Sequence, residues 1–449
     1  MNGFVNRNEE LALLDRLMAS NHRELLVIYG RRRLGKTALL RHFGRGQPLA
    51  YFACPLTTAA EALRLFTREL ARAFDDPLLA RTTFSGWTEA VEYALERCGR
   101  KRTPLVLDEL PYLQRSVPGI DSLLQHAWDG HDDAVKLLLA GSSFSVMDAA
   151  VANPRAPLYG RRTAQLEVQP MSFRDVGGFY LDWSFEQRAV AYGLFGGVPA
   201  YAEQAARHES PAEAAHALAL SPAGPLYAEP DFLVREELRD PGAYFAILHS
   251  LASGKTRPNE IAQDAGIPHA SVGKYLDVLR RLRLVRRETP VTEPRPERSR
   301  RSLYRLDDSL LRFWFRYVYP NRSALEAGGS RDVLGTVVLP DLDTFMGQPY
   351  EDICRQHLID DGERLLGWQP LRVGRYWDAR TEIDLIAVDA SGERAAFVEC
   401  KWGRSVDVAR LVRRLREKAR AVAPYAAASH RYLVISRTDM SDEHHVRLA

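Results

Sequence analysis

The sequence has few cysteines, few lysines and no long apolar run, and each scarcity excludes a class of protein. The four cysteines have neither the spacing of metal ligands nor that of a disulfide framework. The longest apolar runs are far shorter than the ~18 residues that a membrane span needs. The first fourteen residues lack the apolar core of a signal peptide. We therefore expect a cytoplasmic protein with no membrane partner.

Lysine is rare in a chain of otherwise ordinary globular composition, with 46% hydrophobic and 27% charged residues. Of its 61 cationic side chains, seven are lysine and 54 are arginine, and the net charge of +3 indicates by itself no polyanionic partner. Because the planar guanidinium does not replace a compact ammonium at a tight site, the lysine positions point to such sites. Two of the seven, Lys36 and Lys401, lie in motifs that suggest chemistry.

The 449 residues are enough for about three domains, and their pattern predicts a multidomain α/β protein. In residues 1–170, short apolar runs alternate with helical segments, which is typical of a parallel sheet with crossover helices. We expect an alanine-rich helical lid over residues 171–230, a winged helix over 231–327 and a second α/β domain over 328–449.

A phosphate-binding loop follows the first apolar run. Residues 30–37, GRRRLGKT, lie between the expected strand 24–29 and a helical segment, which is the context that G-x-x-x-x-G-K-T requires. Backbone N–H groups of such a loop surround the phosphates of ATP, Lys36 reaches the β- and γ-phosphates, and the Thr37 hydroxyl binds Mg²⁺. The expected ATP-binding residues of the loop are Gly30, Arg31, Arg32, Arg33, Leu34, Gly35, Lys36 and Thr37.

Two later strands of the same domain are expected to supply the remaining catalytic groups. The run Pro104–Leu107 ends in Asp108 and Glu109. We expect Asp108 to bind Mg²⁺ through water and Glu109 to be the general base for hydrolysis. The next strand ends in Gly-Ser-Ser, where Ser142 is expected to orient the attacking water or to sense the γ-phosphate.

Several segments together resemble the archaeal-type ATPases, which are P-loop NTPases of the AAA+/STAND group. They are FVNRNEEL at 4–11, YGRRR at 29–33, GSS at 141–143, PLYGRR at 157–162 and GGVP at 196–199. The resemblance covers about residues 1–325 and implies an ATPase core with a helical lid.

The resemblance also implies roles for residues outside the loop. It places Arg7 near the adenine, although Asn6 stands where the pattern usually has glycine, and it places Pro199 of the lid against the nucleotide. Arg161 and Arg162 lie where related ATPases have an arginine finger, acting in cis or from a neighbouring subunit of a homo-oligomer. The alternative for these two is an ordinary surface pair in an arginine-rich chain.

The segment 231–327 has the pattern of a winged helix. Two helices, 258–265 and 270–282, have helix-turn-helix spacing, and the runs 284–288 and 302–306 are expected to form the wing. Ten arginines against three glutamates between positions 280 and 305 indicate contacts with DNA phosphates. The alternative is a winged helix that packs against its own ATPase domain or against a protein partner.

A second group of catalytic residue types lies near the C-terminus, in the runs EIDLIA at 382–387 and FVECKW at 397–402. Because side chains alternate along a strand, Glu399 and Lys401 share one face, and Asp384 can meet Glu399 across the strand pair. We expect Asp384 and Glu399 to bind Mg²⁺ and Lys401 to steady the attacking water or the phosphate.

These two runs resemble the core of the PD-(D/E)xK nucleases, a restriction-endonuclease-like α/β fold, over about residues 340–440. The resemblance implies that Glu351 on the first helix joins the metal site; Ile383 replaces the usual proline. An ATP-regulated, Mg²⁺-dependent DNA nuclease is therefore the first hypothesis. The alternative is a nucleotide-dependent DNA-binding switch whose nuclease-like domain is inactive. A protein-remodelling ATPase would leave Asp384, Glu399 and Lys401 unexplained.

Overall fold

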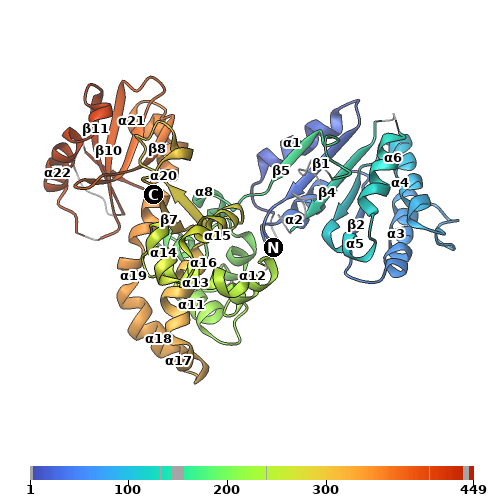
Figure 1. Ribbon diagram of the computed structural model, residues 1–449, viewed down its shortest axis with the longest axis horizontal. Helices are drawn as coiled ribbons and strands as arrows, with labels where there is room; N and C mark the ends of the chain where they lie inside the picture. Colours follow the sequence, from blue (N-terminus) through green and yellow to red (C-terminus); the bar gives the residue numbers. More distant parts are fainter. Residues whose placement is uncertain are drawn as a thin grey trace. The chain divides into compact units, whose positions relative to one another are not determined.

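The computed structural model describes residues 4–131, 134–142, 156–238, 240–403, 405–437 and 444–448. The chain divides into two compact units, Met1–Pro170 and Met171–Ala449 (Figure 1). No helix within the described ranges is long and apolar enough to cross a membrane.

The first unit is built on a sheet of five parallel strands in the order β2-β3-β4-β1-β5. This confirms the parallel sheet that the alternation of segments predicts. Neighbours in this order are distant in sequence, so helices must connect the strands across the sheet. The strands are β1 (Glu24–Tyr29), β2 (Ala50–Ala53), β3 (Leu105–Asp108), β4 (Lys136–Gly141) and β5 (Ala164–Glu167).

Helices cover both faces of this sheet, because its central strands are apolar on both sides. In β1, Leu25 and Val27 pack with one large cluster that includes Phe66 and Leu95, while the intervening Leu26 is also fully buried. The helices are α1 (Asn8–Ala19), α2 (Lys36–Phe43), α3 (Ala59–Phe74), α4 (Trp87–Lys101), α5 (Leu110–Ser116) and α6 (Ile120–Asp129).

The second unit begins with short helices. Gly197 of the GGVP element accepts a hydrogen bond from the Met171 N–H at 2.7 Å, and a Cβ on Gly197 would meet the Met171 carbonyl oxygen at 1.8 Å. Only glycine therefore fits this close approach. The segments are α8 (Phe173–Val176), η1 (Gly177–Phe179), α9 (Phe185–Phe195), α10 (Pro199–Ala205), α11 (Pro211–Ala215), η2 (His216–Leu220) and α12 (Glu229–Glu237).

Three helices and a hairpin follow, and the last two helices and the hairpin lie where the sequence predicts them. They are α13 (Pro241–Ala252), α14 (Pro258–Asp264), α15 (His269–Arg281), β6 (Val285–Glu288), η3 (Pro296–Arg298) and β7 (Leu303–Leu306). The strands β6 and β7 are antiparallel. Helical segments then continue through α16 (Ser309–Phe313), η4 (Trp314–Val318), η5 (Tyr319–Asn321), α17 (Arg322–Glu326), α18 (Ser330–Val333), η6 (Leu334–Val338) and α19 (Leu339–Phe345).

The C-terminal part is a mixed sheet in the order β12-β11-β10-β9-β8. Strands β8, β9 and β10 are antiparallel to one another in turn, and β10, β11 and β12 run parallel. The elements are α20 (Gly347–Asp360), α21 (Gly362–Leu366), β8 (Arg372–Trp377), β9 (Glu382–Val388), β10 (Arg394–Lys401), α22 (Val408–Arg420), η7 (Ala423–Tyr425), β11 (Ser429–Ser436) and β12 (His445–Arg447).

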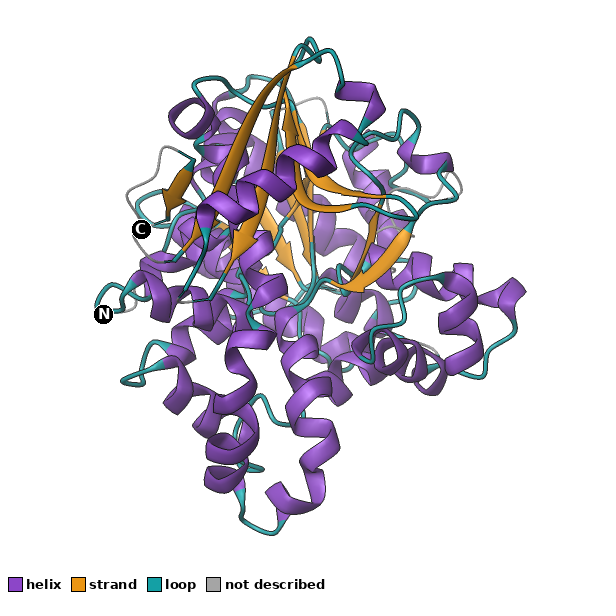
Figure 2. Ribbon diagram, turned by 90° about the vertical axis from the view of Figure 1, so that its left-hand side faces the viewer, coloured by secondary structure: helices purple, strands orange, loops and turns teal. Residues whose placement is uncertain are grey.

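Helices α20 and α22 lie on opposite faces of this mixed sheet, and Figure 2 shows a helix crossing the strands on the face turned toward the viewer. In β10, Phe397 packs with Leu415 and Ala419 of α22. Cys400, which points to the other face, lies against Cys354 of α20. The alternation along β10 therefore gives the strand one side toward each helix.

The loop between β6 and β7 runs along the outer strand of the mixed sheet. The Val291 N–H donates to the Arg375 carbonyl oxygen at 2.8 Å, and the Arg301 guanidinium donates to the Trp377 carbonyl oxygen. Gly374 leaves room for Val291, whose Cβ would lie 3.3 Å from a Cβ at that position. This loop, residues 289–302, is called the wing loop below, and it covers the edge of β8.

Candidate functional site

The phosphate loop is held in shape by two glycines and by a close approach to β5. Gly30 has φ 148°, and a Cβ there would meet the Val168 carbonyl oxygen at 2.5 Å. Gly35, just before α2, has φ 89°, and Arg33 has φ 67°. These left-handed conformations curl the loop between β1 and α2.

The lysine of the loop and the two residues expected to bind Mg²⁺ have defined contacts. The Lys36 ammonium is buried and donates to the carbonyl oxygens of Gly30 at 2.7 Å and Arg31 at 3.1 Å. The Thr37 hydroxyl donates to Asp108 Oδ2 at 2.6 Å. The structure therefore brings the end of β3 to the start of α2, where a hydroxyl and a carboxylate suit Mg²⁺.

Tyr51 of β2 is a further member of this group that the sequence analysis missed. Its hydroxyl donates to Asp108 Oδ2 at 2.6 Å. Burial, together with the hydrogen bond and charge of Asp108, raises the pKa of the Tyr51 phenol, so Tyr51 remains a donor at neutral pH. The pairing of β2 with β3 in parallel register places it there, and that register is not visible in the sequence.

Glu109 and Ser142, from the ends of adjacent strands, are in direct contact. The Ser142 hydroxyl and N–H both donate to Glu109 Oε2, at 2.8 and 3.1 Å. Glu109 has φ 57°, which turns the chain sharply from β3 into α5. The serine thus fixes the orientation of the expected general base. Its neighbour in the GSS motif, Ser143, lies outside the described residues.

The other predicted residues of the first unit have defined partners. Arg7 is buried and donates to the carbonyl oxygens of Leu34 at 2.9 Å and Gln169 at 2.8 Å, which ties the phosphate loop to the end of this unit. Arg32 donates to the Tyr112 hydroxyl at 2.8 Å. Pro199 is the first residue of α10 in the second unit.

Arg161 and Arg162 differ in their surroundings. Arg161 forms a two-pronged ion pair with Asp129, at 2.8 and 2.7 Å, and also donates to the Pro157 carbonyl oxygen at 2.9 Å. Arg162 makes no side-chain hydrogen bond or ion pair with any residue that the structure describes. Of the two, Arg162 has the guanidinium that can reach a ligand without first breaking an ion pair.

The C-terminal candidate residues meet around Lys401. The pairing of Val398 with Leu385 brings Glu399 opposite Asp384 across the antiparallel strands. The Lys401 ammonium lies 2.7 Å from Glu399 Oε1 and 3.8 Å from Asp384 Oδ2. The same Asp384 oxygen accepts the backbone N–H of Cys400 at 2.9 Å. Two carboxylates from neighbouring strands therefore share one lysine.

The closeness of the two carboxylates shifts the pKa values of Asp384 and Lys401. Burial, and then the carboxylate of Glu399, raise the pKa of Asp384. Burial alone would lower the pKa of Lys401, but Asp384 and Glu399 raise it, so the ammonium stays charged. Oxygen ligands under mutual repulsion are the kind of donor set that a divalent cation stabilises.

Glu351 of α20 approaches the same group but is held by an arginine. Burial and the charge of Asp384 raise the pKa of Glu351 to about 7. Its carboxylate lies 3.5 Å from Arg375 Nε. Among the described residues, no three His, Cys, Asp or Glu side chains are placed to hold one metal ion. The three carboxylates expected at one point are thus separated, because Lys401 and Arg375 lie among them.

Several of the arginines expected to form a basic wing are paired within the protein. Arg286 of β6 lies 2.6 Å from Asp352 of α20 and 2.8 Å from Glu288. Glu288 also lies 3.3 Å from Arg305 and 3.2 Å from Arg375. These charges form a network that joins the wing hairpin to α20 and β8. Part of the local excess of arginine therefore has a structural explanation, whereas the side chains of Arg281, Arg295, Arg298 and Arg300 are exposed and make no hydrogen bond or ion pair with the residues that the structure describes.

Comparison with known proteins identifies the family to which the chain belongs. A family model for an ATPase domain predominantly from Archaea matches residues 4–204. An uncharacterized protein of Methanocaldococcus jannaschii is 30% identical over 429 residues, which cover 93% of this chain and 92% of that protein. The chain belongs to the archaeal ATPase family. A segment of 40 residues is also 52% identical to an uncharacterized ATP-binding protein of the same organism, covering 9% of this chain and 68% of that protein.

For the rest of this archaeal-type ATPase, the comparisons give a family of unknown function and a similar fold. A second family model, for archaeal and bacterial proteins of unknown function, matches residues 314–413. The solved Walker-type ATPase of Pyrococcus abyssi is 19% identical with a TM-score of 0.53, over 70% of this chain and 96% of that one. This likeness concerns the fold. Neither family description names a nuclease, so the C-terminal site remains a prediction.

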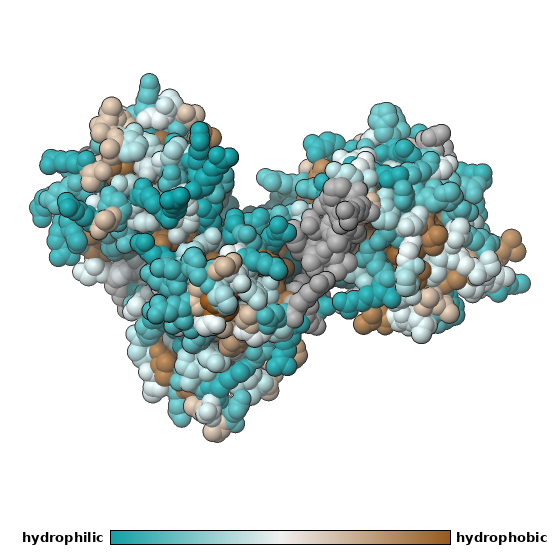
Figure 3. Space-filling model, viewed as in Figure 1, coloured by the Kyte–Doolittle hydropathy of each residue, from teal (hydrophilic) through white to brown (hydrophobic). Residues whose placement is uncertain are grey.

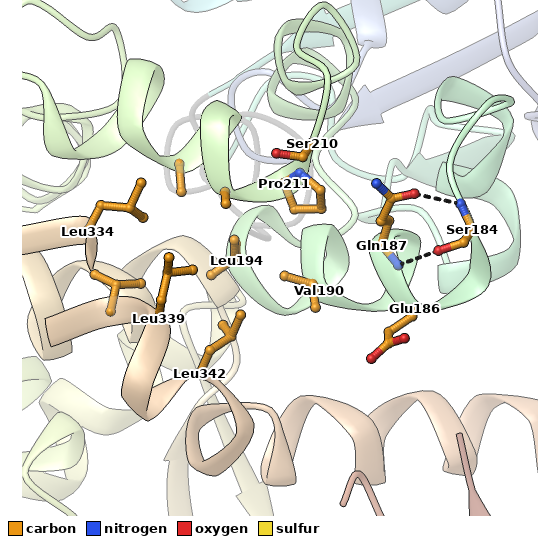
Figure 4. A pocket seen from close by; sticks show the side chains of 13 residues that line it. Ser184, Glu186, Gln187, Val190, Leu194, Ser210, Pro211, Leu334, Leu339 and Leu342 are labelled. Atoms are coloured by element: carbon orange, nitrogen blue, oxygen red, sulfur yellow. Dashed lines mark hydrogen bonds between the residues drawn. The ribbon is translucent and has the colours of Figure 1, made fainter. Parts of the chain in front are cut away.

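An apolar pocket of about 210 Å³ lies apart from these candidate residues in the second unit of the ATPase. Leu334, Leu339 and Leu342 face Val190 and Leu194 of α9 across it (Figure 4). A pocket lined mainly by aliphatic side chains does not suit the phosphates of a nucleotide. It therefore adds no residue to either candidate site.

Proposed function

We propose that this ATPase uses ATP binding and hydrolysis at the phosphate loop to control Mg²⁺-dependent cleavage of DNA in its C-terminal domain. The observation that carries the nuclease half is the contact of Lys401 with both Glu399 and Asp384. A structural surface hairpin has no need of two part-buried carboxylates around one ammonium, because burying charge is costly.

In the ATPase half, each predicted residue has a defined task. Lys36 and the loop backbone bind the phosphates, and Thr37 with Asp108 hold Mg²⁺. Glu109, oriented by Ser142, accepts the proton of the attacking water. The remaining assignments are Arg7 and Pro199 beside the nucleotide, and Arg161 or Arg162 as the arginine finger, with Arg162 favoured by its lack of a described partner.

In the nuclease half, Asp384 and Glu399, with Glu351 nearby, would hold Mg²⁺. When bound, Mg²⁺ would supply positive charge at a phosphoryl oxygen and at a water ligand. Hydrolysis joins the water oxygen to phosphorus and breaks the bond to a sugar oxygen, which leaves with a proton. Lys401 stabilises the negative charge that accumulates on the phosphate as this occurs.

Substitutions in the two sites test the two halves separately. We expect Asp384→Asn and Lys401→Ala each to abolish Mg²⁺-dependent nicking of plasmid DNA and to leave ATP hydrolysis unchanged. Lys36→Ala is expected to lose ATP binding. Glu109→Gln is expected to bind ATP but to hydrolyse it at least ~10²-fold more slowly, the scale of removing a general base. Cleavage that survives in Asp384→Asn would rule out the nuclease site.

A second candidate function is a nucleotide-dependent DNA-binding switch with an inactive nuclease-like domain. It is favoured by the absence, among the described residues, of three side chains placed around one metal position. It predicts that the wild-type protein binds DNA with an affinity that depends on ATP but never cleaves it. The plasmid assay with and without ATP, run beside a binding measurement, distinguishes the two functions.

A further inference from the structure

Helix α22 presents an unusual density of exposed positive charge. Its thirteen residues include five arginines and one lysine against one glutamate, and all five arginines are exposed. Its other face, with Leu411 and Leu415, packs on the mixed sheet. The helix lies at the outer edge of the C-terminal domain (Figure 1), and the surface at this edge is hydrophilic (Figure 3). The arginines of α22 therefore face solvent.

Three of these cations form one row along the helix. Arg410, Arg414 and Lys418 are four residues apart, so their side chains lie next to one another on the same border of the helix. The last of them reaches the candidate site, since Lys418 Nζ lies 3.5 Å from Glu399 Oε2. The row thus leads from solvent to the carboxylates of β9 and β10.

The two arginines of this row are scarcely neutralised by the protein. Arg410 has one weak partner, Asp407, at 4.0 Å. Arg414 makes no hydrogen bond or ion pair with any side chain in the described part of the chain. Exposed guanidinium groups without protein partners are the groups that bind phosphate oxygens and displace counterions from nucleic acid.

Lys418 also belongs to the small set of lysines. Of the seven in the chain, Lys36 lies in the phosphate loop, and both Lys401 and Lys418 contact Glu399. A sequence that uses arginine almost everywhere has lysine at both positions beside this carboxylate. This supports a requirement for compact ammonium groups there.

We propose that Arg410, Arg414 and Lys418 form a phosphate-binding ridge that holds the backbone of a DNA strand and leads it to Asp384, Glu399 and Lys401. The proposal rests on the function proposed for that site. In it, Lys418 is a positioning residue, because it holds Glu399 and, as the last cation of the row, keeps the strand next to the site. DNA contact is thereby assigned to α22 of the C-terminal domain.

The ridge is tested by DNA binding in the full-length Asp384→Asn protein, with a labelled duplex and a labelled single strand at several salt concentrations. We expect Arg410→Gln/Arg414→Gln to weaken binding at low salt and to flatten the salt dependence by about two units, because each arginine neutralises one phosphate and accounts for about one unit of slope. The matched control is Arg413→Gln/Arg420→Gln, which removes the same charge about 110° away from the ridge around the same helix. We expect the control to change the slope by less than about half a unit.

Two results would overturn the ridge: unchanged binding in Arg410→Gln/Arg414→Gln, or equal weakening by both pairs, which indicates a diffuse charge effect. If either accompanies DNA cleavage that depends on Asp384, the ridge fails and the proposed function stands. If the ridge pair alone weakens binding but the wild type never cleaves DNA, the ridge stands as a binding surface and the nuclease function fails.

The positioning role of Lys418 is tested by cleavage kinetics in an otherwise wild-type protein. We expect Lys418→Ala to raise KM for DNA by roughly tenfold, the scale of removing one charged hydrogen bond, with a smaller fall in kcat. Lys418→Arg is expected to restore KM in part, because it restores the charge. A fall in kcat with unchanged KM, or no rescue by arginine, would contradict the role of Lys418 in holding the strand.

Discussion

Two arginine-rich segments of this ATPase differ in what their side chains contact. Residues 280–305 hold ten arginines, of which three are part-buried and held by partners: Arg286 and Arg305 pair with acidic groups, and Arg287 donates to polar groups of the protein. The other seven are exposed, as are all five arginines of helix α22. A count of charge along the sequence therefore does not indicate how many of a segment's cations are available to a ligand.

The difference follows from the kind of element that carries the arginines. The wing hairpin has neighbours on several sides, and its arginines meet acids that are distant in sequence, such as Asp352 on α20. Burial alone would raise the pKa of Asp352, but the guanidinium groups of Arg286, Arg312 and Arg355 together lower it. Helix α22 packs by one face only, and its 3.6-residue period keeps its arginines on the other.

The largest expected effect is on stability, from removing an acid of the buried network. We expect Asp352→Asn to lower the free energy of unfolding by about 3–5 kcal/mol, because the buried guanidinium groups of Arg286 and Arg312 both lose the acid that they share. Urea denaturation followed by tryptophan fluorescence measures the change. Glu417→Gln on the exposed face of α22 is the matched control, since it also removes one carboxylate. If Asp352→Asn and Glu417→Gln were equally stable, the ion pairs of Asp352 with the wing hairpin would not stabilise the fold more than the exposed charges of α22 do.

An intermediate effect is expected on DNA binding from the wing arginines that remain exposed. Arg298, Arg300 and Arg301 are all exposed, but Arg301 donates to the Trp377 carbonyl oxygen. We expect Arg298→Gln/Arg300→Gln to flatten the salt dependence of binding by less than the roughly two units expected for the ridge on α22. A larger change from Arg298→Gln/Arg300→Gln than from Arg410→Gln/Arg414→Gln would reverse the comparison and place DNA on the hairpin of β6 and β7.

The smallest expected effect is on stability, from the exposed arginines of α22. We expect Arg413→Gln/Arg420→Gln to change the free energy of unfolding by no more than about 0.5 kcal/mol, because surface substitutions away from buried networks seldom do more. Thermal and urea unfolding of the full chain measure it. A decrease of more than ~1 kcal/mol would show that these arginines, like those of the wing, stabilise the fold.

The ATPase core was predictable because its signals are local. The strand before the phosphate loop, Glu24–Tyr29, has the bounds expected from its apolar run, and β3 (Leu105–Asp108) is displaced by one residue from the run Pro104–Leu107. Thr37 and Asp108 meet because parallel strands end at the same edge of the sheet. Tyr51 was missed because its contact with Asp108 depends on which strands are neighbours.

In the C-terminal site, only the residues on the neighbouring strands β9 and β10 could be predicted from the sequence. Alternation placed Glu399 and Lys401 on one face, and the two side chains are in contact. The sequence analysis missed Lys418 and Arg375, which reach the site from another helix and another strand. Such contacts depend on how α22 and β8 pack, and no short-range pattern encodes that packing. Arg375 also holds Glu351 away from the two carboxylates that share Lys401.

The wing loop along β8 has a consequence for any attempt to divide this protein. Because the Val291 N–H donates a hydrogen bond to the Arg375 carbonyl oxygen, the loop satisfies part of the hydrogen-bonding capacity at the outer edge of the mixed sheet. A fragment that begins at residue 328 would leave that edge unpaired and would lose the acid Glu288, which neutralises Arg375. An open strand edge pairs readily with other chains. Expression of the C-terminal domain alone is therefore expected to yield aggregates, whereas a fragment from residue 171 retains the loop that prevents them.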